Sequence, residues 1–145
     1  MKIIIEESSD CSETEITITC KKLTESVIKI VSSLRALEQK ILGTLDGQIH
    51  ILSPEDIFYF ESVDKRNFIY TDIGVYETSL RLYEVEEILG DSEFFRATKS
   101  TVLNISKIKT ISPKIGGRLD VVLDNGEKMM VSRQYVTILK EKLDF

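Results

Sequence analysis

The sequence predicts a mainly β fold of the β-rich α+β class, preceded by a small ββα unit at the N-terminus. From residue 41 onward, short segments rich in β-branched and aromatic residues alternate closely with turn signals built from Gly, Asp, Asn and Pro. Residues 1–40 instead combine two β-like segments with one long helical pattern. We therefore expect an N-terminal unit over residues 1–40, which could serve in dimerisation, and a β domain over residues 41–145.

The N-terminal unit is predicted from two kinds of periodicity. The segments Lys2–Glu6 and Glu15–Cys20 are rich in β-branched residues, and apolar and polar residues alternate along the second. Apolar residues then recur every three or four positions between Leu23 and Ile41, which is typical of one face of a helix that Thr24 could cap. Such a unit is too small to bury its own core, so we expect it to pack on the rest of the chain or on a second copy.

The β domain is predicted from its turns. Asp46-Gly47 can adopt the positive φ values of a tight hairpin turn, and Ser53-Pro54 can end the hairpin and start a helical turn. Further strands are expected in the segments IFYFES and NFIYTD on either side of the polar loop VDKR, then in VYETSL, IKTIS, RLDVVL and KMMVS. Short amphipathic helices are expected at residues 82–89, ending at Gly90, and in RQYVTILKEKLDF at the C-terminus.

Composition excludes several classes of protein. The chain of 145 residues is 42% hydrophobic and 30% charged, which is ordinary for a globular protein, and no apolar run approaches the ~20 residues of a membrane helix. The acidic start is wrong for a signal peptide, so we expect a cytoplasmic protein. Cys11, Cys20 and His50 suggest neither a disulfide framework nor a metal site, and we expect reduced thiols and no cofactor.

No recognisable catalytic device is present in the sequence. There is no Gly-rich phosphate loop, nucleophile elbow or zinc-protease motif, and a catalytic triad would depend on the lone His50. The adjacent acids Glu86 and Glu87 would face apart on a helix and are expected to be solvated. Nothing before Ile41 is long enough for a phosphoacceptor domain. We expect no enzyme activity and no catalytic residues.

The distribution of charge is uneven. The formal net charge is -5, yet six basic residues and no acid occur between residues 96 and 118, namely Arg96, Lys99, Lys107, Lys109, Lys114 and Arg118. Such a stretch is either a solvated basic face or the electrostatic footprint of a nucleic acid. The stretch alone does not separate the two interpretations.

Ordered motifs in the last 100 residues favour the second interpretation. The blocks are DIFYFES, then LRLYEVEEILGDSEFFRATKSTVLN, ISKIKTI and LDNGEKMMVSRQYVTILKEKL. Together they resemble the LytTR family, the DNA-binding domain of bacterial transcription regulators of the LytR/AlgR type, whose pattern includes F-x-R-x-H-[RK]-S-x-x-V-N and V-S-R-x-Y. The chain departs from the pattern at Thr98, where the family often has His, so no role of that His carries over.

The resemblance implies an antiparallel β domain that presents loops to double-stranded DNA. The expected contacts come from three segments, which here are Lys65, Arg66 and Asn67; Lys99 and Ser100; and Arg133 and Gln134, with Tyr135 as a further candidate. Lys and Arg neutralise phosphates, whereas Asn and Gln can pair with adenine and Arg with guanine. Such regulators commonly act on repeated half-sites, which suggests a homodimer.

Structural alternatives stand beside these assignments. Arg96 could pair with Glu61 or another acid, Asn104 could lock a turn through its side chain, and Ser132 could cap the last helix. At the level of the whole protein, the alternative is a LytTR-like interaction module, for example an antagonist of a related regulator, that does not bind DNA. The acidity of the chain is the feature that favours this alternative.

Overall fold

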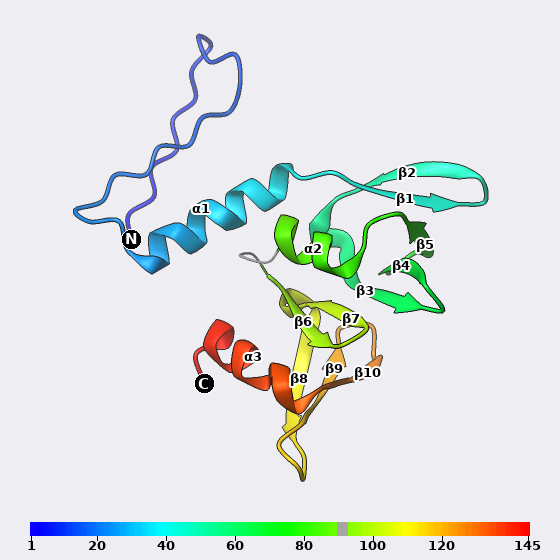
Figure 1. The fold of residues 1–145 in the computed structure, drawn as a ribbon. Coiled ribbons are helices and arrows are strands. Elements are labelled where there is room, and N and C mark those ends of the chain that lie inside the picture. The colour runs from blue at the N-terminus through cyan, green and yellow to red at the C-terminus, as the bar shows by residue number, and fades with distance from the viewer. Residues whose placement is uncertain (90–92) are drawn as a thin grey trace.

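The computed structural model describes residues 1–89 and 93–145, which contain two antiparallel sheets (Figure 1). Sheet A has seven strands in the order β2-β1-β5-β4-β3-β7-β6, and sheet B has three strands in the order β10-β9-β8. The strands of sheet A are β1 Ile41–Leu45, β2 Gln48–Leu52, β3 Ile57–Val63, β4 Arg66–Thr71, β5 Val75–Thr78, β6 Phe94–Thr98 and β7 Thr101–Asn104; those of sheet B are β8 Ile108–Pro113, β9 Leu119–Leu123 and β10 Lys128–Val131. The predicted β-rich fold is confirmed.

Helices are short outside the N-terminal region. The α-helices are α1 Glu25–Glu38, α2 Leu82–Leu89 and α3 Val136–Leu143, and the 3-10 turns are η1 Pro54–Asp56, η2 Ile105–Lys107 and η3 Arg133–Tyr135. The expected helical turn after Ser53 and the expected final helix are therefore present. The predicted end of the second helix at Gly90 lies outside the described residues.

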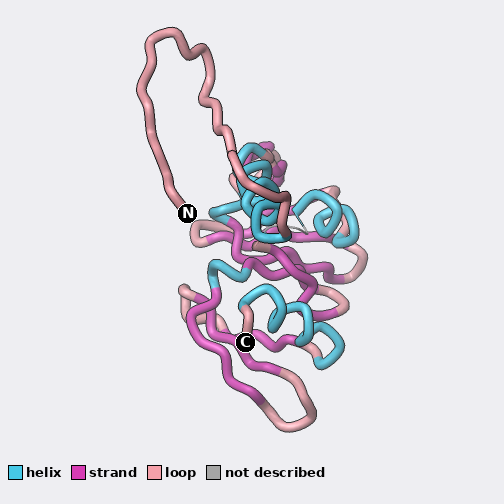
Figure 2. The backbone as a smooth tube through the Cα atoms, turned by 90° about the vertical axis from the view of Figure 1, so that its left-hand side faces the viewer, coloured by secondary structure: helices cyan, strands magenta, loops and turns pink. Residues whose placement is uncertain are grey.

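Sheet A separates two cores because successive side chains of a strand point to opposite faces. On one face, Phe60, Phe94 and Val102 pack with Val85 and other residues of α2. On the opposite face, the strand neighbours of these residues pack with sheet B and α3; this second core comprises Tyr59, Phe95, Leu103, Leu119, Val121, Leu123, Val131, Val136 and Leu139 among others. Figure 2 shows the resulting stack of strands with helices on both sides. Sheet A therefore provides the rigid base for the turns at its ends.

Two hairpin turns in sheet A have positive φ at both central residues. Asp46 and Gly47 have φ values of 52° and 76°, as predicted for the β1–β2 turn, while Asp64 and Lys65 have values of 50° and 64° between β3 and β4. Two-residue turns of this kind match the right-handed twist of the paired strands. The polar segment VDKR is consequently a two-residue turn, shorter than the loop predicted from the sequence.

The N-terminal unit differs from the prediction. Its helix is present as α1, and the hydroxyl of Thr24 accepts a 3.4 Å hydrogen bond from the N–H of Val27, as expected of a cap. However, residues 1–24, all of which the structure describes, contain no strand, and they project from the sheets as a loop (Figure 2). The predicted strands Lys2–Glu6 and Glu15–Cys20 are therefore wrong for this structure. Their β-branched side chains are exposed, and a two-stranded hairpin without a third strand or a core is only marginally stable.

Candidate nucleic-acid interface

Backbone hydrogen bonds hold the three predicted segments next to one another at one end of sheet A. Ser62 lies opposite Asn67 in the β3–β4 ladder, and its N–H donates a 2.9 Å bond to the carbonyl of Ser100 in the β6–β7 turn. The N–H of Ser132, just before η3, donates a 2.8 Å bond to the carbonyl of Ala97 on β6. Segments separated by more than 30 positions in the sequence are thus brought together by backbone hydrogen bonds.

The first segment is divided between a turn and a strand. Lys65 occupies the turn and is exposed, whereas Arg66 and Asn67 are the first residues of β4. An L-residue with positive φ is strained, and a two-residue turn of this type prefers Gly at the position of Lys65. The Lys65 side chain therefore extends into solvent from a turn that is fixed between two paired strands.

Arg66 is held by an acid of the neighbouring strand. Its Nη2 lies 2.7 Å from Oε2 of Glu77, and its Nε donates a 3.0 Å hydrogen bond to Oε1, so the pair is bidentate. This hydrogen bonding lowers the pKa of the Glu77 carboxyl and raises the pKa of the Arg66 guanidinium. Arg66 also lies 5.2 Å from the centre of the Phe68 ring. Its charge is therefore partly balanced within the domain.

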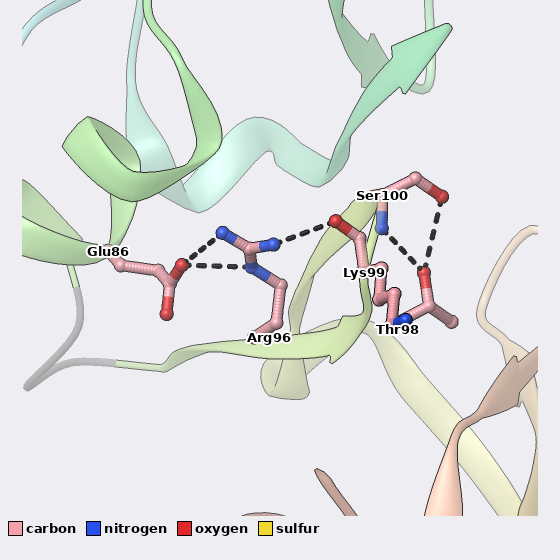
Figure 3. A network of polar contacts seen from close by, with 5 residues as sticks. All are labelled: Glu86, Arg96, Thr98, Lys99 and Ser100. Atoms are coloured by element: carbon pink, nitrogen blue, oxygen red, sulfur yellow. Dashed lines mark hydrogen bonds and ion pairs between the residues drawn. The ribbon is translucent and has the colours of Figure 1, made fainter. Parts of the chain in front are cut away.

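The second segment is a tight turn fixed by Arg96. The Arg96 guanidinium forms an ion pair with Glu86 of α2, and its Nη1 donates a 2.7 Å bond to the carbonyl of Lys99 (Figure 3). This arrangement agrees with the structural alternative for Arg96, although the partner is Glu86 and not Glu61. Because this hydrogen bond holds the backbone carbonyl of Lys99, the exposed Lys99 side chain extends from a fixed position in the turn.

Thr98 shapes the same turn. Its hydroxyl accepts a 3.1 Å hydrogen bond from the backbone N–H of Ser100 and lies 3.4 Å from the Ser100 hydroxyl (Figure 3). A short polar side chain that bonds the backbone two residues later stabilises a turn. The residue that departs from the LytTR pattern thus has a local structural role here.

Asn104 is a buried structural residue. Its side chain is only 1% exposed, and its Nδ2 donates a 2.8 Å bond to the carbonyl of Ile57. Its Oδ1 accepts bonds from the N–H and the hydroxyl of Ser106, at 3.0 and 2.7 Å. These contacts agree with the turn-locking alternative, and burial keeps Asn104 from touching a ligand outside the domain.

The third segment is the 3-10 turn η3 together with Ser132. Arg133 and Gln134 are exposed, whereas Tyr135 is half-buried against the core formed with sheet B. The Ser132 side chain makes no capping hydrogen bond, so the predicted cap is absent. The structure also places the β8–β9 turn against Arg133: a Cβ added to Gly117 would lie 3.4 Å from Cγ of Arg133. Motif reasoning missed this turn, although the acid-free stretch contained its two cations.

Several acids near the sheets have internal partners that the sequence did not reveal. The Tyr59 hydroxyl donates a 2.8 Å bond to Glu127, and the Tyr70 hydroxyl donates a 3.2 Å bond to Glu61. Burial is the largest cause that raises the pKa of both phenols, and the neighbouring carboxylates raise it further. Both phenols therefore stay protonated donors near neutral pH. Glu61 and Glu127 are thus hydrogen-bonded within the domain.

Within residues 1–89 and 93–145, no three His, Cys, Asp or Glu side chains gather where they could hold a metal ion. Along the same residues, no helix is both long and apolar enough to span a membrane. The exposed Lys and Arg side chains at the end of sheet A are suited to binding phosphate groups.

Comparisons with known proteins cover most of the chain. Residues 47–144 match the family model for the LytTr DNA-binding domain. The chain is 39% identical over 99 residues to the sensory transduction protein LytT of Enterococcus faecalis, covering 68% of this chain and 40% of that protein. It is 27% identical over 145 residues to an uncharacterised HTH-type transcriptional regulator of Staphylococcus aureus, covering 99% of this chain and 98% of that protein.

A solved structure shows the same fold. It is the LytTr DNA-binding domain of a protein described as a methyl-accepting/DNA response regulator from Bacillus cereus, with a TM-score of 0.69 and 24% sequence identity. The match covers 74% of this chain and 99% of that domain. The family model spans most of the β domain that the sequence predicts for residues 41–145.

Proposed function

Given that the chain belongs to the LytTr DNA-binding domain family, we propose that it regulates transcription by recognising specific sequences in double-stranded DNA. The family consists of DNA-binding domains and not of enzymes. A DNA partner would place the protein in the cytoplasm. The proposed contact residues are Lys65, Arg66, Asn67, Lys99, Ser100, Arg133 and Gln134.

The observation that carries the proposal is the single surface formed by the three segments. The hydrogen bonds from Ser62 to Ser100 and from Ser132 to Ala97 join separate turns at one end of sheet A. Rigid strands reduce the ordering cost of binding, because the turns are already in place before DNA arrives. The surface would therefore dock as a unit.

Within this surface we propose a division of roles. Lys65 and Lys99 are exposed cations on turns and would neutralise phosphates, which fixes the position of the domain without reading sequence. Asn67, Gln134 and Arg133 have side chains that can form bidentate bonds with base edges in the major groove. The proposal thus separates positioning residues from reading residues.

The proposal is tested by titrating the protein with duplex DNA selected from a random library, at several salt concentrations. A regulator that binds through several phosphates should lose affinity linearly in a log-log plot, with a slope of about -0.9 for each phosphate neutralised. It should also prefer the selected sequence to a scrambled duplex of equal length. No binding at low salt would overturn the proposal.

We further propose a homodimer that binds repeated half-sites, with α1 in the interface. Among the described side chains of α1, none is buried; on its apolar face Ile30 and Leu34 are only partly covered and Leu37 is 62% exposed. Covering such an apolar helix face with a second copy removes apolar surface from water, which favours association. Ile30→Glu with Leu37→Glu, which changes two residues on the same face of α1, should lower the mass measured in solution to that of a monomer; an unchanged mass would remove α1 from the interface.

A protein-interaction module that does not bind DNA is the second candidate. The observation that favours it is the apolar surface on the outer face of the β1–β2 hairpin and β5, where Leu42, Ile49, Ile51 and Val75 are all exposed. Exposed apolar patches often mark contact sites for other proteins. The DNA titration separates the candidates, because this module would show no salt-dependent binding to duplex DNA.

A further inference from the structure

We propose that the tip of the β8–β9 hairpin, residues 114–118, is a fourth DNA-contacting element that binds the phosphate backbone beside the segment contacted by η3. The inference rests on the proposed function, and it adds an arm to the three segments expected from the family pattern. The arm is formed by Lys114, Ile115, Gly116, Gly117 and Arg118.

The position of the hairpin is the first argument. A Cβ built on Gly117 would meet Cγ, Cδ and Nε of Arg133 at 3.4, 3.6 and 3.8 Å, so the turn lies directly against this side chain. Figure 1 shows the hairpin extending beyond the start of α3. A duplex that contacts Arg133 would therefore pass close to the hairpin tip.

The charge of the tip is the second argument. Lys114 and Arg118 are both exposed, and residues 114–118 contain no acid. The nearest described ion pair is weak, because Nζ of Lys114 lies 4.0 Å from Oδ2 of Asp120 with both side chains nearly half-exposed. No ion pair of Arg118 occurs among the described residues. Two exposed cations next to Arg133 form a local positive surface on an acidic chain, which suits the phosphate backbone.

The shape of the tip is the third argument. The N–H of Lys114 donates a 3.0 Å bond to the carbonyl of Arg118, which closes the turn, and Gly116 and Gly117 take φ values of 91° and 82°. Ile115 at the apex is 98% exposed, so contact with a partner would remove apolar surface from water. Proteins that bind the minor groove combine Arg and Lys with apolar side chains that contact the DNA. Ile115 would thus contact deoxyribose while Lys114 and Arg118 hold the adjoining phosphates.

The test compares two double variants of the full chain. Lys114→Ala with Arg118→Ala removes the cations of the tip. Lys109→Ala with Lys128→Ala removes the same charge from the opposite end of sheet B, where Ile108 and Lys128 pair with Leu123 and Val122. Affinity for a selected duplex is measured at several salt concentrations, and hydroxyl-radical footprints are recorded on the same duplex. Thermal unfolding confirms that each variant is folded.

The tip variant should bind with a log-log salt slope shallower by about 2, so that the wild type loses roughly tenfold more affinity than the variant over a fourfold rise in salt. The backbone protections at one flank of each half-site should also disappear. The control variant should keep the wild-type slope and footprint. Ile115→Ser should lower affinity without changing the slope.

Two outcomes would overturn this inference. In the first, the tip variant has the slope and footprint of the wild type while Lys99→Ala still shallows the slope; the proposed function then stands and the arm is wrong. In the second, both double variants weaken binding equally, which would assign the effect to net charge. Absence of salt-dependent binding by the wild type would instead contradict the proposed function itself.

Discussion

Arg66 and Glu77 form a bidentate ion pair between β4 and β5, with 2.7 Å between Nη2 and Oε2 and 3.0 Å between Nε and Oε1. Asn67, the next residue along β4, belongs to the proposed reading set. The pair is exposed, so it contributes little to stability, but it determines where the guanidinium is directed before DNA binds. Arg66 must exchange this carboxylate for a phosphate or a base if it contacts DNA.

Glu77→Gln should therefore increase DNA affinity. The substitution removes a negative charge beside the proposed interface and frees the guanidinium, so the log-log salt slope should steepen by up to about 1. Glu87→Gln, which removes the same charge from the exposed face of α2, serves as the control and should have a smaller effect. Equal changes for both variants would show that Arg66 does not reach the duplex.

The same pair gives a pH dependence of folding stability. The hydrogen bond from Arg66 lowers the pKa of Glu77 below its ordinary value of 4.5, so the folded state binds this proton less readily than the unfolded state. The resulting stabilisation is present above pH 4.5 and is lost as the pH falls through the lowered folded-state pKa. Denaturant unfolding of the wild type and Glu77→Gln should differ near neutral pH and converge in strong acid. A difference that grows towards acid would contradict the sign.

Lys65→Gly should stabilise the domain and weaken DNA binding. Lys65 has a φ of 64° in a turn where Gly is preferred, and removal of its Cβ should relieve strain of up to about 1 kcal/mol. Lys65→Ala is the matched control, because it loses the same charge but keeps the strained backbone. Both variants should lose affinity equally in salt titrations, while only the Gly variant should gain unfolding free energy.

Lys99 should behave differently from Asn67 and Gln134. Lys99→Ala should weaken binding to all sequences about equally and shallow the salt slope by about 1. Asn67→Ala and Gln134→Ala should instead reduce discrimination at single base positions by about 1–3 kcal/mol and leave the slope nearly unchanged. The measurement is a set of titrations with the selected duplex and its single-position variants. Equal effects on selected and random DNA would reject the division of roles.

Arg96 should influence binding through the position of the β6–β7 turn. Arg96→Gln, Glu86→Gln and the double variant should show non-additive losses of unfolding free energy, with a coupling of about 0.5–3 kcal/mol. Both single variants should reduce DNA affinity because the Lys99 carbonyl loses a firmly held partner. A shallower salt slope for Arg96→Gln, with no change of slope for Glu86→Gln, would mean that Arg96 touches phosphate directly.

Local signals predicted much of the fold. Asp46-Gly47 marked the first hairpin, and the alternation of apolar residues marked the strands, because turn geometry and side-chain period are properties of a few neighbouring residues. The same reasoning was wrong for Glu15–Cys20, whose alternation has no partner strand in this structure. A strand depends on its neighbour for hydrogen bonds, and a single segment does not specify that neighbour.

The sequence by itself determined the family, most of the strands from residue 41 onward and the three segments proposed to meet DNA, but it did not indicate β6 and β7 as strands. Only the tertiary structure decided which residues lie in contact: Arg96 with Glu86, Arg66 with Glu77, and Gly117 of the β8–β9 turn with Arg133. These contacts join residues on different strands and helices. They follow from the pairing order of the sheets and the packing of α2 and sheet B on sheet A, which involve the whole chain at once.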